Sequence, residues 1–322
     1  MHSSKFFKFF PPPRYMDIVH VGLEISDDAI RCLQYTSPTH GRKIAKFASV
    51  KLDNHIVRGG DIADEKSFIE ILSKFSHDND LSYVKVSVPE EKAYLFQTDV
   101  PDADLYKISQ NIEFKLEENV PLTAADAVFY FDILPISVTG GALRASVSVV
   151  PRVYIEHILQ LLRGLGISPM GFEVVPKAIA RAIIPLYSEN TIMIIHIMNE
   201  KTGVYIVSGG VVCFTSTIGW GSCTTEAGNI GDVNILAKEI NRIHNYWMSH
   251  SVVNSQIEKA MLVGSGILPY ENTLKKAFSE FGLNSSVANV WENAFSIDKY
   301  IPPISMEDSL DYAVVAGLAM DL

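Results

Sequence analysis

The chain has 322 residues, of which 48% are hydrophobic, and it carries a formal charge of -10 at pH 7. It has no dense Lys/Arg stripe, which argues against nucleic-acid binding, and its longest apolar runs are too short for a membrane-spanning helix of about 20 residues. The three cysteines and nine histidines show no disulfide or metal-ligand spacing, so we expect a reducing compartment and no metal site.

Residues 1–15 are expected to form a flexible leader. Four phenylalanines lie there beside Lys5 and Lys8, ahead of three consecutive prolines. The apolar run is short and no small-residue cleavage site follows it, which is unlike a signal peptide. Two interpretations stay open. The segment is either the disorder that is common at chain termini, or a docking tag, because aromatic and basic clusters favour membrane interfaces and apolar grooves.

A three-stranded meander is expected next. Residues 18–25, 29–35 and 43–52 are typical of strands, and short polar connections join them. Apolar and polar residues alternate in the third strand, which indicates one buried face. Residues 64–75 are typical of a helix, because apolar residues recur at helical spacing behind an acidic N-terminus.

The middle of the chain has a different order of elements. The pattern predicts a strand at 83–88, a helix at 103–118, strands at 127–134 and 143–150, and a helix at 153–165. The two later strands are joined by a Gly140-Gly141 turn. We interpret residues 83–165 as a small module inserted into the first domain.

The second half repeats the logic of the first. The expected elements are strands at 191–198, 202–207, 211–218 and 259–263, and helices at 233–249, 270–281 and 310–320. Two meanders, each followed by helices, imply two related α/β halves with a cleft between them. A length of 322 residues agrees with about two domains.

The order and spacing of six segments resemble the PilM family of type IV pilus assembly proteins, which belongs to the actin-like ATPase superfamily and is related to FtsA. The segments are VGLEISDDAIR at 21–31, residues 88–134, residues 149–183, ILAKEINRIHNYW at 235–247, residues 260–282 with the run GSG, and SLDYAVVAGLAM at 309–320. No one of them is specific alone, since Gly-Ser-Gly after a strand is common. The resemblance runs from about Asp17 to the C-terminus.

This resemblance implies an α/β fold of the actin-like ATPase type, with two duplicated lobes and an inserted SHS2 (1C) module. The implied division is a first lobe at 16–82, 166–190 and 305–322, a module at 83–165, and a second lobe at 191–304. The leader at 1–15 lies outside these units.

The resemblance also implies a nucleotide site in which two β-hairpins hold the phosphates, and an Asp on each positions Mg²⁺. Here Glu24 and Ser26 stand at the Asp and Gly positions of the first hairpin, and His196 and Met198 at those of the second. We therefore expect a degenerate site with little or no hydrolysis, since phosphoryl transfer depends on positioning and charge neutralisation. The candidate nucleotide-binding residues are Glu24, Ser26, Asp27, Asn199, Thr202, Lys238, Glu239, Gly264 and Gly266.

The candidate cofactor is ATP, with Mg²⁺ only where ATP is bound, and no catalytic residue is predicted. Structural interpretations compete with these assignments. Glu24 is also compatible with a solvated turn, and His196 with a core histidine bonded to a backbone carbonyl. The glycines at 264 and 266 are compatible with the end of a strand and the start of a helix.

For partners, the resemblance implies that the groove between the first domain and the module holds an N-terminal peptide of PilN, a membrane-anchored protein. The candidate partner-binding residues are Phe96, Phe114, Leu116, Val120 and Leu122, and their alternative interpretation is core packing. The expected role is a cytoplasmic scaffold at the inner face of the cytoplasmic membrane, associated with other inner-membrane components of the pilus machine.

Two other functions stay open. An ATPase or small-molecule kinase predicts intact metal carboxylates and an acidic base in the cleft, and the hairpins lack the former. A filament protein like FtsA predicts an amphipathic membrane helix after the last core helix, whereas this sequence ends at Leu322.

Overall fold

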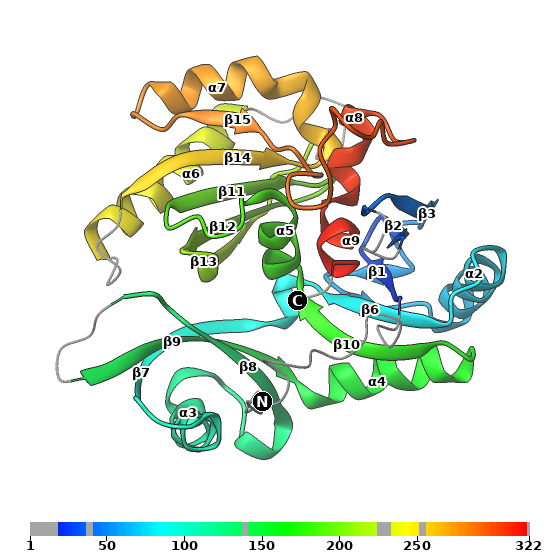
Figure 1. Ribbon diagram of the computed structural model, residues 1–322, viewed down its shortest axis with the longest axis horizontal. Helices are drawn as coiled ribbons and strands as arrows, with labels where there is room; N and C mark the ends of the chain where they lie inside the picture. Colours follow the sequence, from blue (N-terminus) through cyan, green and yellow to red (C-terminus); the bar gives the residue numbers. More distant parts are fainter. Residues whose placement is uncertain (1–18, 37–40, 137–140, 224–232, 251–255, 321–322) are drawn as a thin grey trace.

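A computed structural model describes residues 19–36, 41–136, 141–223, 233–250 and 256–320. The predicted leader at 1–15 lies outside the described residues. Figure 1 shows two lobes that meet at a pair of central helices, with a third unit below them.

The first lobe is built on a five-stranded sheet with the order β10-β6-β1-β2-β3. Its strands are β1 (Val21–Ile25), β2 (Ala29–Tyr35), β3 (Ile44–Lys51), β6 (Tyr83–Val88) and β10 (Ser168–Val174). Helices α2 (Glu65–Asp78) and α4 (Arg152–Gly164) bury apolar side chains, among them Phe68 and Leu162, against this sheet. The side chain of Asp64 caps α2 by accepting a hydrogen bond from the Ser67 N–H.

The second lobe repeats this topology with the order β13-β12-β11-β14-β15. Its elements are β11 (Thr191–Ile197), β12 (Thr202–Ser208), β13 (Val211–Ile218), β14 (Ile257–Val263), β15 (Ser285–Val287), α6 (Val233–His250) and α7 (Glu271–Ser279). Strand β11 pairs antiparallel with β12 and parallel with β14, as β1 pairs with β2 and β6. The predicted internal duplication is therefore present.

The third unit is the inserted module, which consists of β7 (Tyr94–Pro101), α3 (Leu105–Asn119), β8 (Ala127–Ile133) and β9 (Ala142–Pro151). Its sheet has the order β7-β9-β8, and α3 packs on it through Ile108, Ile112 and Leu116. In Figure 1, α3 lies on the side of this sheet that faces away from the second lobe.

The assignment of the strand at 83–88 to this module was wrong. That strand is β6, which pairs in parallel with β1 and β10 in the first lobe. The module begins instead with β7, a strand that the sequence pattern did not predict. The helix at 153–165, expected in the module, is α4 and packs on the first lobe. Parallel pairing joins residues far apart in sequence, so an apolar run does not indicate which sheet receives it.

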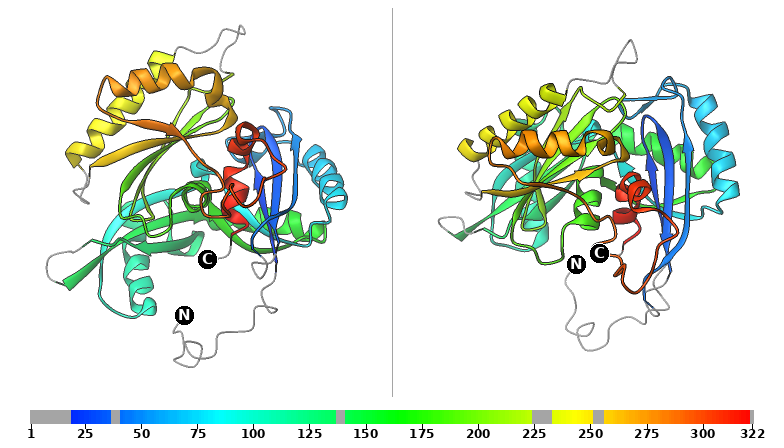
Figure 2. Two further views of the ribbon diagram at one scale, coloured as in Figure 1. Left: turned by 45° about the horizontal axis from the view of Figure 1, so that its top comes forward. Right: turned by 90° about the horizontal axis from the view of Figure 1, so that it is seen from above.

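Two helices join the lobes. The structure places α5 (Val175–Ile183) and α9 (Ala313–Leu318) against each other in the centre of the molecule. A side chain at Gly317 would put its Cβ 1.8 Å from the Ala178 carbonyl oxygen, so glycine is required for the close approach. Figure 2 shows α9 lying between the strands of the first lobe and those of the second.

The remaining elements are short. They are β4 (Val57–Arg58), β5 (Asp61–Ile62), α8 (Met306–Ser309), and the 3-10 turns at Glu90–Lys92, Ala124–Asp126, Ser265–Tyr270 and Leu310–Tyr312. The helix expected at 310–320 is thus one turn of 3-10 helix followed by α9. Within the described ranges, we find no helix with the length and apolarity needed to cross a membrane.

Candidate functional site

The turns after β1 and β11 meet directly across the boundary between the lobes. Asn199 Nδ2 donates to Asp28 Oδ2 at 3.0 Å, and Lys201 Nζ donates to Asp27 Oδ2 at 2.9 Å. Beside them, Asn54 Nδ2 donates to Glu200 Oε1 at 2.7 Å. Side chains of one lobe therefore bond those of the other at the place where the resemblance predicts a phosphate site.

Below this contact lies a cavity of about 560 Å³ between the lobes. Its charged lining residues are Glu24, Asp28, Asp308, Asp311, Arg31 and Lys51. Four carboxyl groups thus face two cations. Because like charges repel in a partly enclosed space, this wall disfavours a bare polyphosphate.

Glu24 is a strand residue that is only 5% exposed, so the solvated-turn interpretation is wrong. Burial raises its pKa to about 7, and the Arg31 guanidinium at 3.4 Å opposes that rise. Arg31 also pairs with Asp28 at 3.4 Å. The carboxylate expected to position a metal is therefore already engaged by a cation.

His196 is buried at the corresponding place in β11. Burial lowers its pKa to about 4, so the ring is neutral at pH 7. Its Nδ1 has no hydrogen-bond partner among the described residues, so this nitrogen does not make the backbone-carbonyl bond that a core histidine is expected to form. A neutral ring supplies no negative charge for a metal ion at this position.

Ser26 is held in place by its own turn, and Asp27 by the turn between β4 and β5. The Ser26 hydroxyl donates to Asp28 Oδ1 at 2.6 Å, and Asp27 Oδ1 accepts from the Gly60 N–H at 2.9 Å. Burial alone would raise the pKa of Asp27, but the Gly60 N–H and Lys201 hold it below its ordinary value. Asp27 therefore stays ionised and paired with Lys201.

Of the other predicted nucleotide-binding residues, some line the cavity and others lie outside it. Asn199 and Gly266 line the cavity. Thr202 is fully buried, and its hydroxyl donates to the Trp220 carbonyl at 2.7 Å.

Lys238 and Glu239 on α6 are not brought to this cavity. Glu239 instead lines a groove against β13, and Lys238 is exposed. Sequence reasoning missed Asp28, Arg31 and Lys201, although all three stand within a few residues of predicted ones.

Gly264 is explained by packing. Its φ is +94°, and a Cβ there would lie 2.1 Å from the Ile197 carbonyl oxygen. The end of β14 thus passes close to the end of β11. The interpretation that this glycine ends a strand and precedes a helical turn agrees with the 3-10 turn that follows at 265–270.

A second recess, of about 180 Å³, lies between the module and the first lobe. It is lined mainly by apolar side chains of β8, β9, β10 and α4, namely Val128, Phe129, Tyr130, Val150, Ile155 and Phe172. Tyr130 is 56% exposed. Its charged lining residues are Lys85, Glu173 and Lys177. Lys177 Nζ donates to Asp132 Oδ2 at 2.7 Å and lies 3.9 Å from the centre of the Tyr130 ring. We call this recess the module groove.

None of the predicted partner-binding residues lines the module groove. Leu116 and Val120 are buried in the module core, and Phe96 and Leu122 pack against that core. Phe114 is 85% exposed on α3. Core packing therefore describes four of the five, while sequence reasoning missed Val128 and Tyr130.

No known protein-family model matches the sequence, and no curated protein matches it. Among solved structures, the chain is similar to one in a "PilM-PilN type IV pilus biogenesis complex", with a TM-score of 0.78 and 17% identity over 95% of this chain and 98% of that chain. It is also similar to ethanolamine utilization protein EutJ from Carboxydothermus hydrogenoformans, with a TM-score of 0.52 and 13% identity over 96% and 90%. The chain therefore shares the fold of the protein in the PilM-PilN complex, as the resemblance predicted.

Proposed function

We propose that this chain is a scaffold of the type IV pilus assembly machine that binds the N-terminal peptide of a PilN-like membrane protein in the module groove. The observation that carries the proposal is the similarity, over 95% of the chain, to a protein of a PilM–PilN complex. In this proposal the scaffold lies in the cytoplasm and associates with the membrane only through its partners, which include other inner-membrane components of the machine.

The module groove is suited to an extended peptide. Strand β8 is an edge of the module sheet and β10 is an edge of the first-lobe sheet, and both border the groove. An edge strand offers unpaired backbone N–H and C=O groups to an added strand. Val128, Val150 and Phe172 provide the apolar lining for alternate side chains of such a peptide.

The charged side chains beside the groove limit which peptides can bind there. Lys177, from α5 of the first lobe, bonds both carboxylate oxygens of Asp132, from β8 of the module, at 2.9 and 2.7 Å. Both side chains are mostly buried, so a charged peptide residue beside them would compete with this ion pair. We expect the part of the peptide in the groove to be mainly apolar.

We propose further that the nucleotide site is degenerate. Metal and triphosphate do not fit the residues present, because Asn199 and Lys201 already bond the first hairpin, and Glu24 is engaged by Arg31. Neutral His196 offers no opposing carboxylate. The chain acts as a binding module in this proposal, without an ATPase cycle of its own.

The test is a calorimetric titration of the full chain with a synthetic peptide of the N-terminal residues of its PilN-like partner. Val128→Asp places a charge in the apolar lining and should weaken binding about tenfold or more, since the bound peptide would bury that charge without a partner. Phe114→Asp is the matched control, because Phe114 belongs to the same module but lies exposed on α3. Equal loss in both variants, or loss only in Phe114→Asp, would place the peptide elsewhere, and no binding to the wild type would refute the proposed function.

A further inference from the structure

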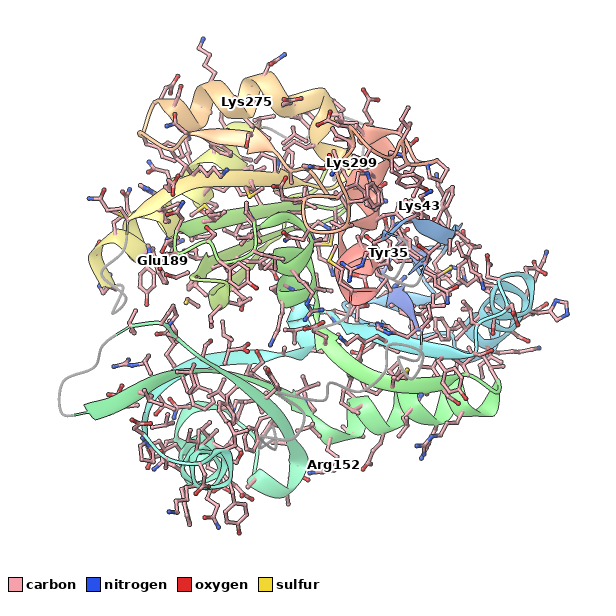
Figure 3. The ribbon with its side chains drawn as sticks, viewed as in Figure 1. Tyr35, Lys43, Arg152, Glu189, Lys275 and Lys299 are labelled. Carbon is pink, nitrogen blue, oxygen red and sulfur yellow. The ribbon has the colours of Figure 1, made fainter. Side chains whose placement is uncertain are left out.

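The module is fastened to both lobes, although the chain enters and leaves it from the first lobe only. Its exit is short, since β9 runs directly into α4, where Arg152 donates to the Ala125 carbonyl at 2.7 Å and to the Ala127 carbonyl at 3.0 Å. Figure 3 shows Arg152 at this junction. Its first connection is the 3-10 turn Glu90–Lys92, between β6 and β7, which we call the hinge turn.

The hinge turn is held by the second lobe. The Tyr205 hydroxyl donates to Glu90 Oε1 at 2.9 Å, and both side chains are buried. Lys201 forms an ion pair with Glu91. A Cβ at Gly203 would lie 2.9 Å from Glu90 Oε1 and 2.1 Å from the Tyr205 hydroxyl oxygen, so glycine at this position permits the contact. The hinge turn is therefore held by Tyr205 of β12 and by Lys201, which directly precedes that strand, and Gly203 of β12 leaves room for the contact.

The sheet of the module also rests on the second lobe. Gln97 Nε2 donates to the Cys213 carbonyl at 3.1 Å, and the Ser146 hydroxyl donates to the Val212 carbonyl at 2.6 Å. Both acceptors belong to β13, the edge strand of that lobe. One wall of the module groove is therefore part of the first lobe, and the other wall belongs to the module, which is bonded to the second lobe.

Lys201 takes part in both places. Its ammonium bonds Asp27 in the contact between the hairpins and Glu91 in the hinge turn. Burial would lower the pKa of Lys201, but Glu91 and Asp27 hold it above its ordinary value, so the charge persists at pH 7. The contact between the lobes and the hinge turn thus share one ammonium group.

We propose that closure of the two lobes and peptide affinity in the module groove are coupled through the hinge turn, with Lys201 as the positioning residue that joins them. This inference rests on the proposed function, since it concerns regulation of the same groove. Coupling of this kind is reciprocal: whatever closes the lobes strengthens peptide binding, and the peptide in turn stabilises lobe closure. In this proposal, the contact between the lobes and the peptide in the groove both act on the orientation of the module.

The experiment measures hydrogen exchange and peptide affinity on the full chain. Lys201→Met should speed exchange in residues 90–101 and weaken binding of the synthetic PilN-like peptide about fivefold or more, a typical coupling. Lys201→Arg, which keeps the charge, should restore most of the affinity. Lys275→Met is the matched control, because Lys275 pairs with Glu271 on α7, on the outer side of the second lobe (Figure 3).

The reciprocal arm uses the wild type. Peptide at saturation should slow exchange at residues 26–28 and 198–201, which a purely structural role of Lys201 would not cause. If Lys201→Met fails to fold, Gly203→Ala displaces the hinge turn without removing a charge, and should give the same two changes. Unchanged exchange at 90–101 and unchanged affinity in a folded variant would overturn the coupling. A wild type that binds no peptide would refute the proposed function, and the exchange of the hinge turn would still report whether Lys201 holds it.

Discussion

The two lobes share one topology but differ in the chemistry of their corresponding hairpins. In the first lobe, Glu24 lies in an ionic cluster with Arg31 and Asp28. In the second, His196 is a neutral buried ring, and the turn that follows carries the cation Lys201, which pairs with Asp27. The duplicated backbone persists because strand pairing depends on backbone bonds and apolar burial, whereas the site depends on a few side chains that the fold does not need.

The lobes are joined by the close contact of α5 and α9. A substitution that breaks this contact should change the free energy of unfolding more than any other change considered below. Gly317→Val places side-chain atoms where a Cβ alone would lie 1.8 Å from the Ala178 carbonyl oxygen. We expect a loss of about 3 kcal/mol or more in the free energy of unfolding, because overpacking against backbone cannot relax easily. Urea unfolding measures it, and Gly164→Val on α4, where nothing lies within 4 Å, is the control. A loss no larger than the control's would mean that the helices are not packed as described.

The two hairpins should respond oppositely to pH. The pKa of Glu24 is raised from 4.5 to about 7, so the folded state binds more protons and Glu24 lowers stability as pH rises through that window. The pKa of His196 is lowered from 6.5 to about 4, so His196 raises stability as pH rises from 4 to 6.5. Each contribution is on the order of 3 kcal/mol at most, from 1.4 kcal/mol per unit of pKa shift.

Substitution separates the two contributions. Between pH 4.5 and 6.5, unfolding free energy should rise more steeply with pH in Glu24→Gln than in the wild type, and less steeply in His196→Gln. Urea titrations at three pH values measure the slopes. Parallel slopes in all three proteins would show that these two groups are not perturbed by burial as stated.

Placing Asp and Gly in the second hairpin, at positions 196 and 198, should give the smallest expected effect, a change in nucleotide affinity. His196→Asp with Met198→Gly should strengthen binding of a fluorescent ATP analogue about tenfold with Mg²⁺, the typical value of one charged contact. His196→Asn with Met198→Gly is the control that lacks the charge.

Wild-type turnover of Mg-ATP should stay at background and be unchanged by Glu24→Gln. A steady-state turnover that Glu24→Gln abolishes would contradict the proposed degeneracy.

The division of the chain shows how far local pattern reaches. The meanders and the main helices were predicted because alternation and helical spacing are local signals. The strand at 83–88 was assigned to the wrong unit, since its partners β1 and β10 lie far from it in sequence. Strand β7 was missed because its residues are mostly half-buried and show no clean alternation.

For the candidate site, the sequence by itself determined the residue types: Glu24 and His196 stand where the resemblance predicts aspartates. It also determined, through the order of six segments, that the fold is of the actin-like type. Only the tertiary structure decided that Lys201 bonds Asp27 and Glu91 at once, and that Val128 and Tyr130, not Leu116 and Val120, line the module groove. The physical reason is that burial and pairing depend on the tertiary structure, since apolar residues on equally regular elements differ only in what the rest of the chain packs against them.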